Sequence, residues 1–315
     1  MKNAILLVAA AALISGVASA AEYAVEKLGT IGLDMVEANP VVFKGQPWLC
    51  QYVRKHKAGR FLNLTDMKTV TPEFGKGMGM HCAFVAGDRV YVTANARKHK
   101  AFVIMDSADL VNWSEPRTIF EQPDWGNFYN SSMCRADDRY VLVGEVYGKG
   151  PEYVMSFFES KDLKEWKMIP GVGHCRNGKG YSGSPCLKYH DGWFYFFNLQ
   201  PDGKNEKRET LWRMKVVRSR DLKTWEKGLR TVLDFGPEDR KIHPGFTFDE
   251  AERARIANDT DVNASDLDFR EYKGDLIVSY SWGNQKGREF LALGRVRNCT
   301  EKAFCESFFK GEQAK

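Results

Sequence analysis

The chain has 315 residues, of which 43% are hydrophobic and 28% are charged, and this balance excludes a disordered polymer and a protein with several membrane spans. Aromatic residues make up 13% of the chain, a content that favours β structure or a carbohydrate-binding surface over a helical bundle. The formal net charge of +5 comes without a long basic run, so the sequence does not indicate a nucleic-acid partner.

Residues 1–20 have the pattern of a secretory signal peptide. One lysine precedes an apolar run, and Ala18, Ser19 and Ala20 form a small-x-small cleavage site. The apolar run is short for a membrane anchor, and we expect no membrane partner. The sequence therefore predicts an exported, periplasmic or secreted monomer in which residues 21–315 form a single domain.

The seven cysteines fit an oxidising compartment, and their odd number leaves at least one thiol free. Cys299 and Cys305 are close enough in sequence to form a disulfide near the C-terminus. Cys82, Cys134 and Cys186 each precede a turn by a few residues, and we expect these three side chains to pack in the core.

Five turns containing Gly or Asp, each between two apolar or aromatic runs, predict five β-hairpins. The turns lie at residues 44–45, 86–88, 137–138, 191–192 and 273–275. A second series keeps register with the first: the pattern Ser-x-Asp-Leu-x-x-Trp occurs at residues 107–113, 160–166 and 219–225, with a degenerate copy at 66–70. The copies are about 43 to 59 residues apart, which is the period of a propeller blade.

Together the two series predict an all-β fold, a five-bladed β-propeller with little helix. The Ser and Asp of each copy are expected to cap a tight turn, and Trp113, Trp166 and Trp225 to be buried between blades. We expect residues 23–31 to pair with the last blade and close the ring. A short helix is expected at 249–256, inside a long insertion that should flank the channel mouth.

The candidate site residues follow from this architecture. The first strand of each blade lines the channel, so polar groups at the strand starts can converge at one mouth. The acids of catalytic interest are Glu37 and Asp266, on the neighbouring first and fifth blades, and Glu145, inside the apolar second strand of the third blade. The candidate substrate-binding residues are Asn39, His81, Asn130, Ser184, Asp268 and Glu271.

Glu145 has two interpretations. A carboxylate within an apolar strand is costly unless it is paired or neutral, so Glu145 either lies at an edge position or in an ion pair with an arginine such as Arg135, or has a raised pKa. A carboxyl with a raised pKa is suited to act as a general acid. Alternation along the fifth blade's first strand places Asp266 and Asp268 on one face.

The five hairpins and the Ser-x-Asp-Leu-x-x-Trp repeat of an exported chain resemble the five-bladed propeller glycoside hydrolases, the group that includes glycoside hydrolase families 43 and 32. The resemblance covers nearly the whole mature chain, and the segment from Ser265 to Gln285 also resembles members of that group. It implies hydrolysis of a glycosidic bond in a plant or algal oligosaccharide or polysaccharide by paired carboxylates.

The acidic triad of those families is not carried over to this chain. Their Asn-Asp-Pro motif aligns near Asn39, which lacks the preceding Asp and has Glu37 as the nearest acid. Their second and third acids align near Asn130 and near residues 183–185, where this chain has no acid. The resemblance implies no cofactor and no catalytic metal, and leaves room for a structural calcium ion in the channel.

Three other functions stay open at this level. The missing triad is compatible with a carbohydrate-binding propeller without catalysis. A glycoside phosphorylase would need a basic phosphate pocket, to which Arg135, Arg176 and Lys179 could contribute. A sialidase-type propeller is a weaker alternative, because its repeat has a Gly that is missing here. Two carboxyls at one mouth would favour hydrolysis over binding alone.

Overall fold

The computed structural model describes residues 23–149, 153–176 and 181–310. The predicted signal peptide therefore lies outside the described residues. Within them the fold is all-β, as expected, and its strands belong to four hydrogen-bonded sheets. All five predicted hairpin turns join consecutive antiparallel strands.

Three of the sheets are antiparallel and follow the chain in order. The first contains β2 (Asn39–Phe43), β3 (Gln46–Val53) and β4 (Ala58–Asn63). The second contains β5 (Gly79–Ala86), β6 (Arg89–Ala96), β7 (Ala101–Ser107) and β8 (Arg117–Glu121). The third contains β9 (Asn127–Ala136), β10 (Arg139–Tyr147), β11 (Tyr153–Ser160), β12 (Lys167–Met168) and β13 (His174–Arg176).

The largest sheet consists of two antiparallel groups that a single parallel bridge, between Trp212 and Asn263, connects. One group contains β14 (Gly183–His190), β15 (Trp193–Lys204), β16 (Thr210–Ser219) and β17 (Glu226–Lys227). The other contains β18 (Asn263–Tyr272), β19 (Asp275–Gly283), β20 (Glu289–Val296) and β1 (Glu26–Leu33). The pairing of β1 with β20 confirms that the N-terminal segment joins the last group.

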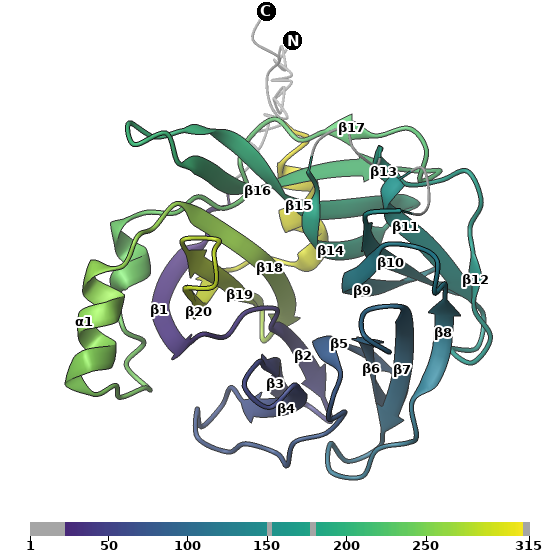
Figure 1. The fold of residues 1–315 in the computed structure, drawn as a ribbon, viewed down its shortest axis with the longest axis horizontal. Coiled ribbons are helices and arrows are strands. Elements are labelled where there is room, and N and C mark those ends of the chain that lie inside the picture. Colours follow the sequence, from purple (N-terminus) through teal and green to yellow (C-terminus); the bar gives the residue numbers. More distant parts are fainter. Residues whose placement is uncertain (1–22, 150–152, 177–180, 311–315) are drawn as a thin grey trace, which may run out of the picture.

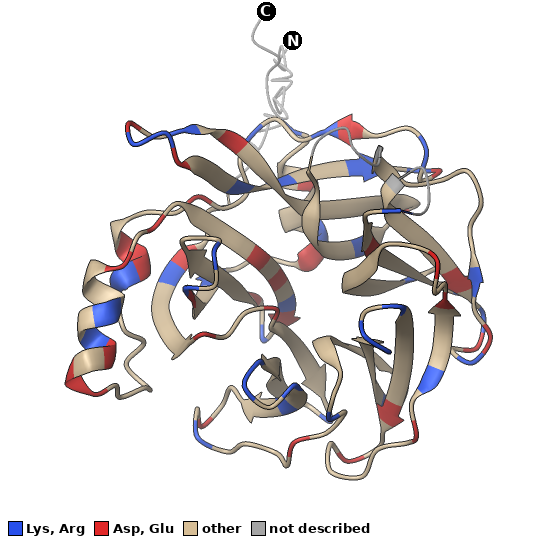
Figure 2. Cartoon of the chain, viewed as in Figure 1, with Lys and Arg blue, Asp and Glu red and all other residues tan. Residues whose placement is uncertain are grey.

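The first strands of the successive hairpins surround the middle of the molecule (Figure 1). Contacts link β2 to β5, β5 to β9, β9 to β14, β14 to β18, and β18 back to β2. Apolar clusters fill the spaces between neighbouring sheets, and the largest also contains α2 (Glu301–Ser307). Figure 2 shows acidic and basic residues spread over all the sheets.

The Ser-x-Asp-Leu-x-x-Trp repeat is a turn-forming motif, as predicted. In the first copy, the hydroxyl of Ser107 accepts a hydrogen bond of 2.9 Å from the amide of Leu110, and Asp109 accepts bonds from the next two amides. Leu110, Leu163 and Leu222 all have left-handed backbones, with φ of 66°, 62° and 59°. These local hydrogen bonds, together with burial of the leucine, hold a conformation that is costly for a non-glycine residue.

The expected burial of the motif's tryptophans is only partly right. Trp113, Trp166 and Trp225 pack against the apolar clusters but are only half-buried, whereas the leucine of each copy is fully buried. Trp113 stacks at a centroid distance of 4.0 Å on Phe74, which lies between β4 and β5 and bridges to Gly59 of β4. In each copy the leucine and the tryptophan belong to the same apolar cluster, with the leucine in its buried part and the tryptophan partly exposed.

The predictions for the cysteines are also only partly right. Cys134 and Cys186 are buried in apolar clusters, which confirms core packing for these two side chains, whereas Cys82 is only half-buried and belongs to none of the clusters. The expected disulfide between Cys299 and Cys305 is wrong, because both thiols are free. Helix α2 begins between them and holds Cys305 in the core.

The predicted short helix is present as α1 (Glu250–Asn258), and Asp249 caps it by accepting a hydrogen bond of 2.8 Å from the amide of Glu252. It follows a 3-10 turn, η1 (Pro237–Arg240). Figure 1 shows α1 at the outer edge of the molecule, beside β1. In the parts of the chain that the structure describes, no helix has the length and apolar character needed to cross a membrane.

Candidate active site

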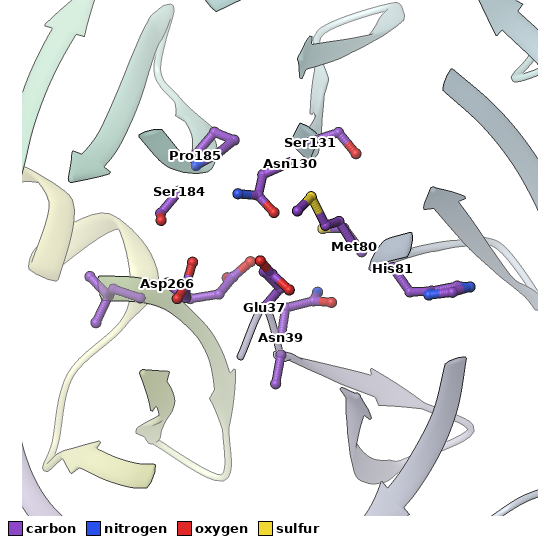
Figure 3. Close-up of a pocket in the computed structure, with 13 residues that line it drawn as sticks. Glu37, Asn39, Met80, His81, Asn130, Ser131, Ser184, Pro185 and Asp266 are labelled. Carbon is purple, nitrogen blue, oxygen red and sulfur yellow. The ribbon is translucent and has the colours of Figure 1, made fainter. Parts of the chain in front are cut away.

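Five residues at equivalent places in the five hairpins line one central cavity. They lie within four residues of the start of the first strands: Glu37, Met80, Asn130, Ser184 and Asp266. All except Asn130 have left-handed backbones, with φ between 49° and 56°. Irregular pairing accompanies these positions in β5, β9, β14 and β18. Such bulges redirect a side chain, and in Figure 3 Glu37, Met80, Asn130, Ser184 and Asp266 surround the middle of the view, whereas the ring of His81 points away from it.

The cavity has a volume of about 360 Å³, which is within the usual range for a small-molecule site. Eight further residues line it: Val36, Arg54, Tyr129, Glu145, Tyr147, Tyr181, Gln285 and Glu289. The same five strand-start residues bound a second space of about 30 Å³, comparable to the volume of one water molecule.

Glu145 lies in β10 and is almost fully buried, with 4% exposure. The side-chain amide of Asn130 donates a hydrogen bond of 3.2 Å to its Oε2. Burial raises the pKa of Glu145 to about 7, although the hydrogen bond from Asn130 opposes the shift. The alternative of an ion pair with Arg135 does not hold, because Arg135 is exposed and its Nε bonds the carbonyl of Asp137.

Glu37 faces the same cavity. Its side chain is partly exposed where it borders the cavity and is otherwise surrounded by protein atoms. Its Oε2 atom has no hydrogen-bond partner among the described residues. Burial raises the pKa of Glu37 well above its ordinary value, and the charge of Asp266 raises it further.

Asp266 is better placed to carry a negative charge. The hydroxyl of Ser265 donates a hydrogen bond of 2.8 Å to its Oδ2, and the side chain of Ser184 also favours the charged form. Burial nevertheless raises the pKa of Asp266 above its ordinary value. These three carboxyls of the cavity come from the segment before β2, from β10 and from β18, and they have different hydrogen-bond environments.

An ion pair closes one wall of the cavity. Arg54, directly after β3, places its Nη1 at 2.8 Å from Oε2 of Glu289, the first residue of β20. The sequence does not point to either residue, because neither lies near the start of a first strand nor interrupts an apolar run. It does not point to Tyr129, Tyr147 or Tyr181 either, although Tyr129 directly precedes Asn130.

The structure assigns Asn39 and His81 to packing and not to the cavity wall. The amide of Asn39 forms two hydrogen bonds of 2.8 Å with the backbone of Ala83, which joins the first two sheets. His81 is 1% exposed and packs edge-on against Phe74. Burial lowers the pKa of His81 to about 4, so it is a poor proton donor at neutral pH. Both border only the smaller space.

Asp268 and Glu271 are also directed elsewhere. Asp268 forms a buried ion pair with Lys188, 2.8 Å between Oδ1 and Nζ. The register shift between Ser265 and Asp268 overturns the expectation that Asp266 and Asp268 share a face. Glu271 is exposed and accepts a hydrogen bond of 3.2 Å from the amide of Glu301 in α2, so the structure does not bring it to the cavity.

Contrary to expectation, the long insertion, residues 235–263, does not contribute to the cavity wall. Its described residues are absent from the lining of the central cavity. Arg255 of α1 instead forms an ion pair of 2.8 Å with Asp34, just after β1. Within the described ranges, no group of three or more His, Cys, Asp or Glu side chains is arranged to hold a metal ion.

Comparison with known proteins shows which proteins have a similar fold. No protein-family model matches the chain. A segment of 83 residues is 34% identical to the non-reducing end alpha-L-arabinofuranosidase BoGH43B of Bacteroides ovatus. This segment is 23% of the present chain and 15% of that protein, so the match spans a small part of the curated relative.

Two solved structures match most of the chain. The GH43 endo-arabinanase from Bacillus licheniformis has a TM-score of 0.54 and 11% identity, covering 85% of this chain and 96% of that one. The GH32 beta-fructofuranosidase BmSUC1 of Bombyx mori has a TM-score of 0.56 and 12% identity, covering 87% of this chain and 62% of that one. The chain resembles glycoside hydrolases of families 43 and 32 in fold, which confirms the expected resemblance.

Proposed function

We propose that the protein is a glycoside hydrolase acting on a plant or algal oligosaccharide or polysaccharide. The observation that carries this proposal is that Glu37, Glu145 and Asp266 line one cavity of about 360 Å³. Hydrolysis of a glycosidic bond needs a proton donor and a second carboxylate at one site. The arabinan- and arabinoside-hydrolysing activities named for the similar proteins support a plant polysaccharide as the substrate.

The charges of the cavity suggest the division of roles. Arg54 is already paired with Glu289, so the three carboxyls share no unpaired cation among the cavity's lining residues. Mutual repulsion and burial then favour protonation of some of them at neutral pH. Glu145, with a pKa of about 7, is assigned as the proton donor.

Asp266 is assigned as the general base or nucleophile, because the Ser265 hydroxyl stabilises its anion. Glu37, whose pKa is raised well above the ordinary value, would orient the sugar or adjust the pKa of Asp266. Asn130 positions Glu145 and would donate to a sugar hydroxyl with its remaining hydrogen. Ser184 borders the same space and is suited to the same type of contact.

The architecture we propose with this function is a five-bladed propeller. The closed sequence of contacts from β2 through β5, β9, β14 and β18 back to β2 supports it. A single propeller domain at 21–315, export through residues 1–20 and a monomeric state belong to the same proposal. Mass spectrometry of the mature exported protein would test the cleavage site.

The alternatives have less support. Phosphorolysis requires a free cation for phosphate, but the cationic side chain that lines the cavity is Arg54, which Glu289 neutralises. Arg135 lines a different cavity, and Lys179 lies outside the described residues. A purely carbohydrate-binding propeller does not require three carboxyls with raised pKa values in one cavity.

The test is a screen of the purified protein for release of reducing sugar from neutral arabinose and xylose polysaccharides and their oligosaccharides. Glu145→Gln and Asp266→Asn variants should both lose the activity. Saccharide binding without release of reducing sugar by the wild-type protein would favour the binding-only alternative. Activity that appears only with inorganic phosphate would favour the phosphorylase.

A further inference from the structure

Tyrosines form one side of the carboxyl cavity. Tyr129 comes from β9, Tyr147 ends β10, and Tyr181 lies just before β14. Tyr147 is 44% exposed, and few other large hydrophobic side chains among the described residues are exposed to solvent. Its ring lies 6.3 Å from that of Tyr181 at an interplanar angle of 49°.

The position of Tyr181 is fixed by packing. Its ring contacts Trp212 of β16 edge-on, at a centroid distance of 5.2 Å and an angle of 77°. A Cβ atom at position 183 would lie 2.3 Å from the Tyr181 hydroxyl, so Gly183 leaves the space that this side chain occupies. The ring is therefore held in place before any ligand binds, which lowers the entropic cost of binding.

The composition of the cavity selects the chemistry of a ligand. The walls combine aromatic faces with carboxyl, amide and hydroxyl groups. The arginine in the wall, Arg54, forms an ion pair with Glu289. A negatively charged group would meet Glu37, Glu145 and Asp266 without a free cation to compensate. An uncharged ring with apolar C–H faces and hydroxyl edges, as in a neutral sugar, fits this combination.

We propose that Tyr147 and Tyr181 form a subsite for a second neutral sugar ring, next to the ring that is cleaved at the carboxyls. This inference rests on the proposed function and extends it. Tyr147 would cover one face of the second ring, and Tyr181, supported by Trp212, would separate the two sugar positions. The protein should then prefer chains of at least two units over a single sugar.

The experiment measures binding of neutral xylose and arabinose oligosaccharides of increasing length by titration calorimetry, in a Glu145→Gln background that prevents turnover. Tyr147→Ala should raise the Kd for chains of two or more units about tenfold, the scale of one lost aromatic contact, and leave the Kd of the monosaccharide unchanged. Tyr147→Phe, which keeps the ring, should bind like the parent.

Tyr272→Ala is the matched control, because this half-buried tyrosine lies at the opposite end of β18 from Asp266 and does not line the cavity. Equal affinity of the parent and Tyr147→Ala for every chain length would overturn the subsite and leave the proposed function intact. Failure of the parent to bind any neutral saccharide would overturn the proposed function, and the subsite with it.

Discussion

Arg54 and Glu289 form an ion pair of 2.8 Å that joins the first sheet to the last at the wall of the carboxyl cavity. Glu289 is almost fully buried, and its other oxygen accepts a hydrogen bond of 2.9 Å from the amide of Gly287. The positive charge of Arg54 favours the ionised forms of both Glu37 and Asp266. The pair therefore combines a structural contact with an electrostatic effect on the proposed catalytic acids.

Replacing Arg54 with Met should raise the pKa of Asp266, because the favourable charge is lost. The acidic limb of the pH profile of kcat/KM should then move to higher pH, with a larger loss of activity at pH 5 than at pH 7. The double variant Arg54→Met, Glu289→Gln is the control, because it also removes the buried charge of Glu289 that Arg54→Met leaves unpaired. It should recover stability, while the pH profile of kcat/KM stays shifted. An unchanged acidic limb in both variants would contradict this electrostatic role.

Glu145→Gln should reduce kcat by about 10²–10⁴-fold, the usual effect of losing a general acid. Stability should change little, because the replacement is nearly isosteric and burial raises the pKa of Glu145 to about 7, so a large fraction of the native side chain is already neutral at neutral pH. The exposed Glu165→Gln serves as the matched control. If Glu145→Gln kept full activity and Glu37→Gln lost it, the donor role would pass to Glu37.

The wild-type protein should lose activity as the pH rises above about 7. A proton donor must be protonated, and burial raises the pKa of Glu145 to about 7, so its protonated fraction falls through this range. Measurement of kcat/KM from pH 5 to pH 9 on a competent substrate tests this prediction. A profile that stays flat to pH 9 would be inconsistent with Glu145 as the donor.

Lys188→Met should lower the free energy of unfolding by about 3–5 kcal/mol, because it leaves the buried carboxylate of Asp268 without its partner. Lys188 also donates a hydrogen bond of 2.8 Å to the carbonyl of Phe269, so the loss includes a second contact. The double variant Lys188→Met, Asp268→Leu should recover much of the stability. Urea unfolding measures both, and a loss below about 1 kcal/mol for the single variant would show that the pair is not needed.

Stability should decrease as the pH rises from about 4 toward 9, and Asp261 should contribute to this decrease together with the buried carboxyls of the cavity. Burial raises the pKa of Asp261 well above the ordinary value, and the nearby Asp239 raises it further, while Arg240 and Lys27 oppose the shift. Arg240 is 3.7 Å away, too far for a hydrogen bond, and the Lys27 ammonium is 2.6 Å from Asp239. The folded state therefore retains a proton that the unfolded chain releases, and folding weakens as that proton is lost.

Asp261→Asn should partly flatten this dependence and raise the melting temperature at pH 9 more than at pH 5. Tyr280, whose hydroxyl donates a hydrogen bond of 2.9 Å to Asp239, titrates only at higher pH because burial raises its pKa. Thermal unfolding of the wild type and the variant at several pH values makes the comparison. Parallel pH curves for the two proteins would count against Asp261 as a contributing group.

The hairpins could be predicted from the sequence because each turn depends on its own few residues. The repeat motif could be interpreted for the same reason, since its hydrogen bonds lie within a single turn. The bulge at Asp266 could not be predicted, because strict alternation places Asp266 and Asp268 together. The register shift instead directs Asp266 to the cavity and Asp268 to Lys188.

Part of the candidate site was equally predictable. Glu37 and Asp266 could be found because they sit where first strands begin, and Glu145 because it interrupts an apolar strand. Arg54 and Glu289 could not, since both are ordinary surface residues by sequence, and only the approach of the first sheet to the last brings them together. Long-range proximity of this kind leaves no local pattern.

The left-handed backbone at the cavity has a consequence for how this protein could change over time. Glutamate, methionine, serine and aspartate all occupy it, just before β2 and within β5, β14 and β18, so the conformation is compatible with different side chains. Exchange at Met80 or Ser184 would then alter the reactive groups of the cavity while leaving strand pairing untouched. Single substitutions at these positions could therefore replace one set of acids with another while the protein remains folded.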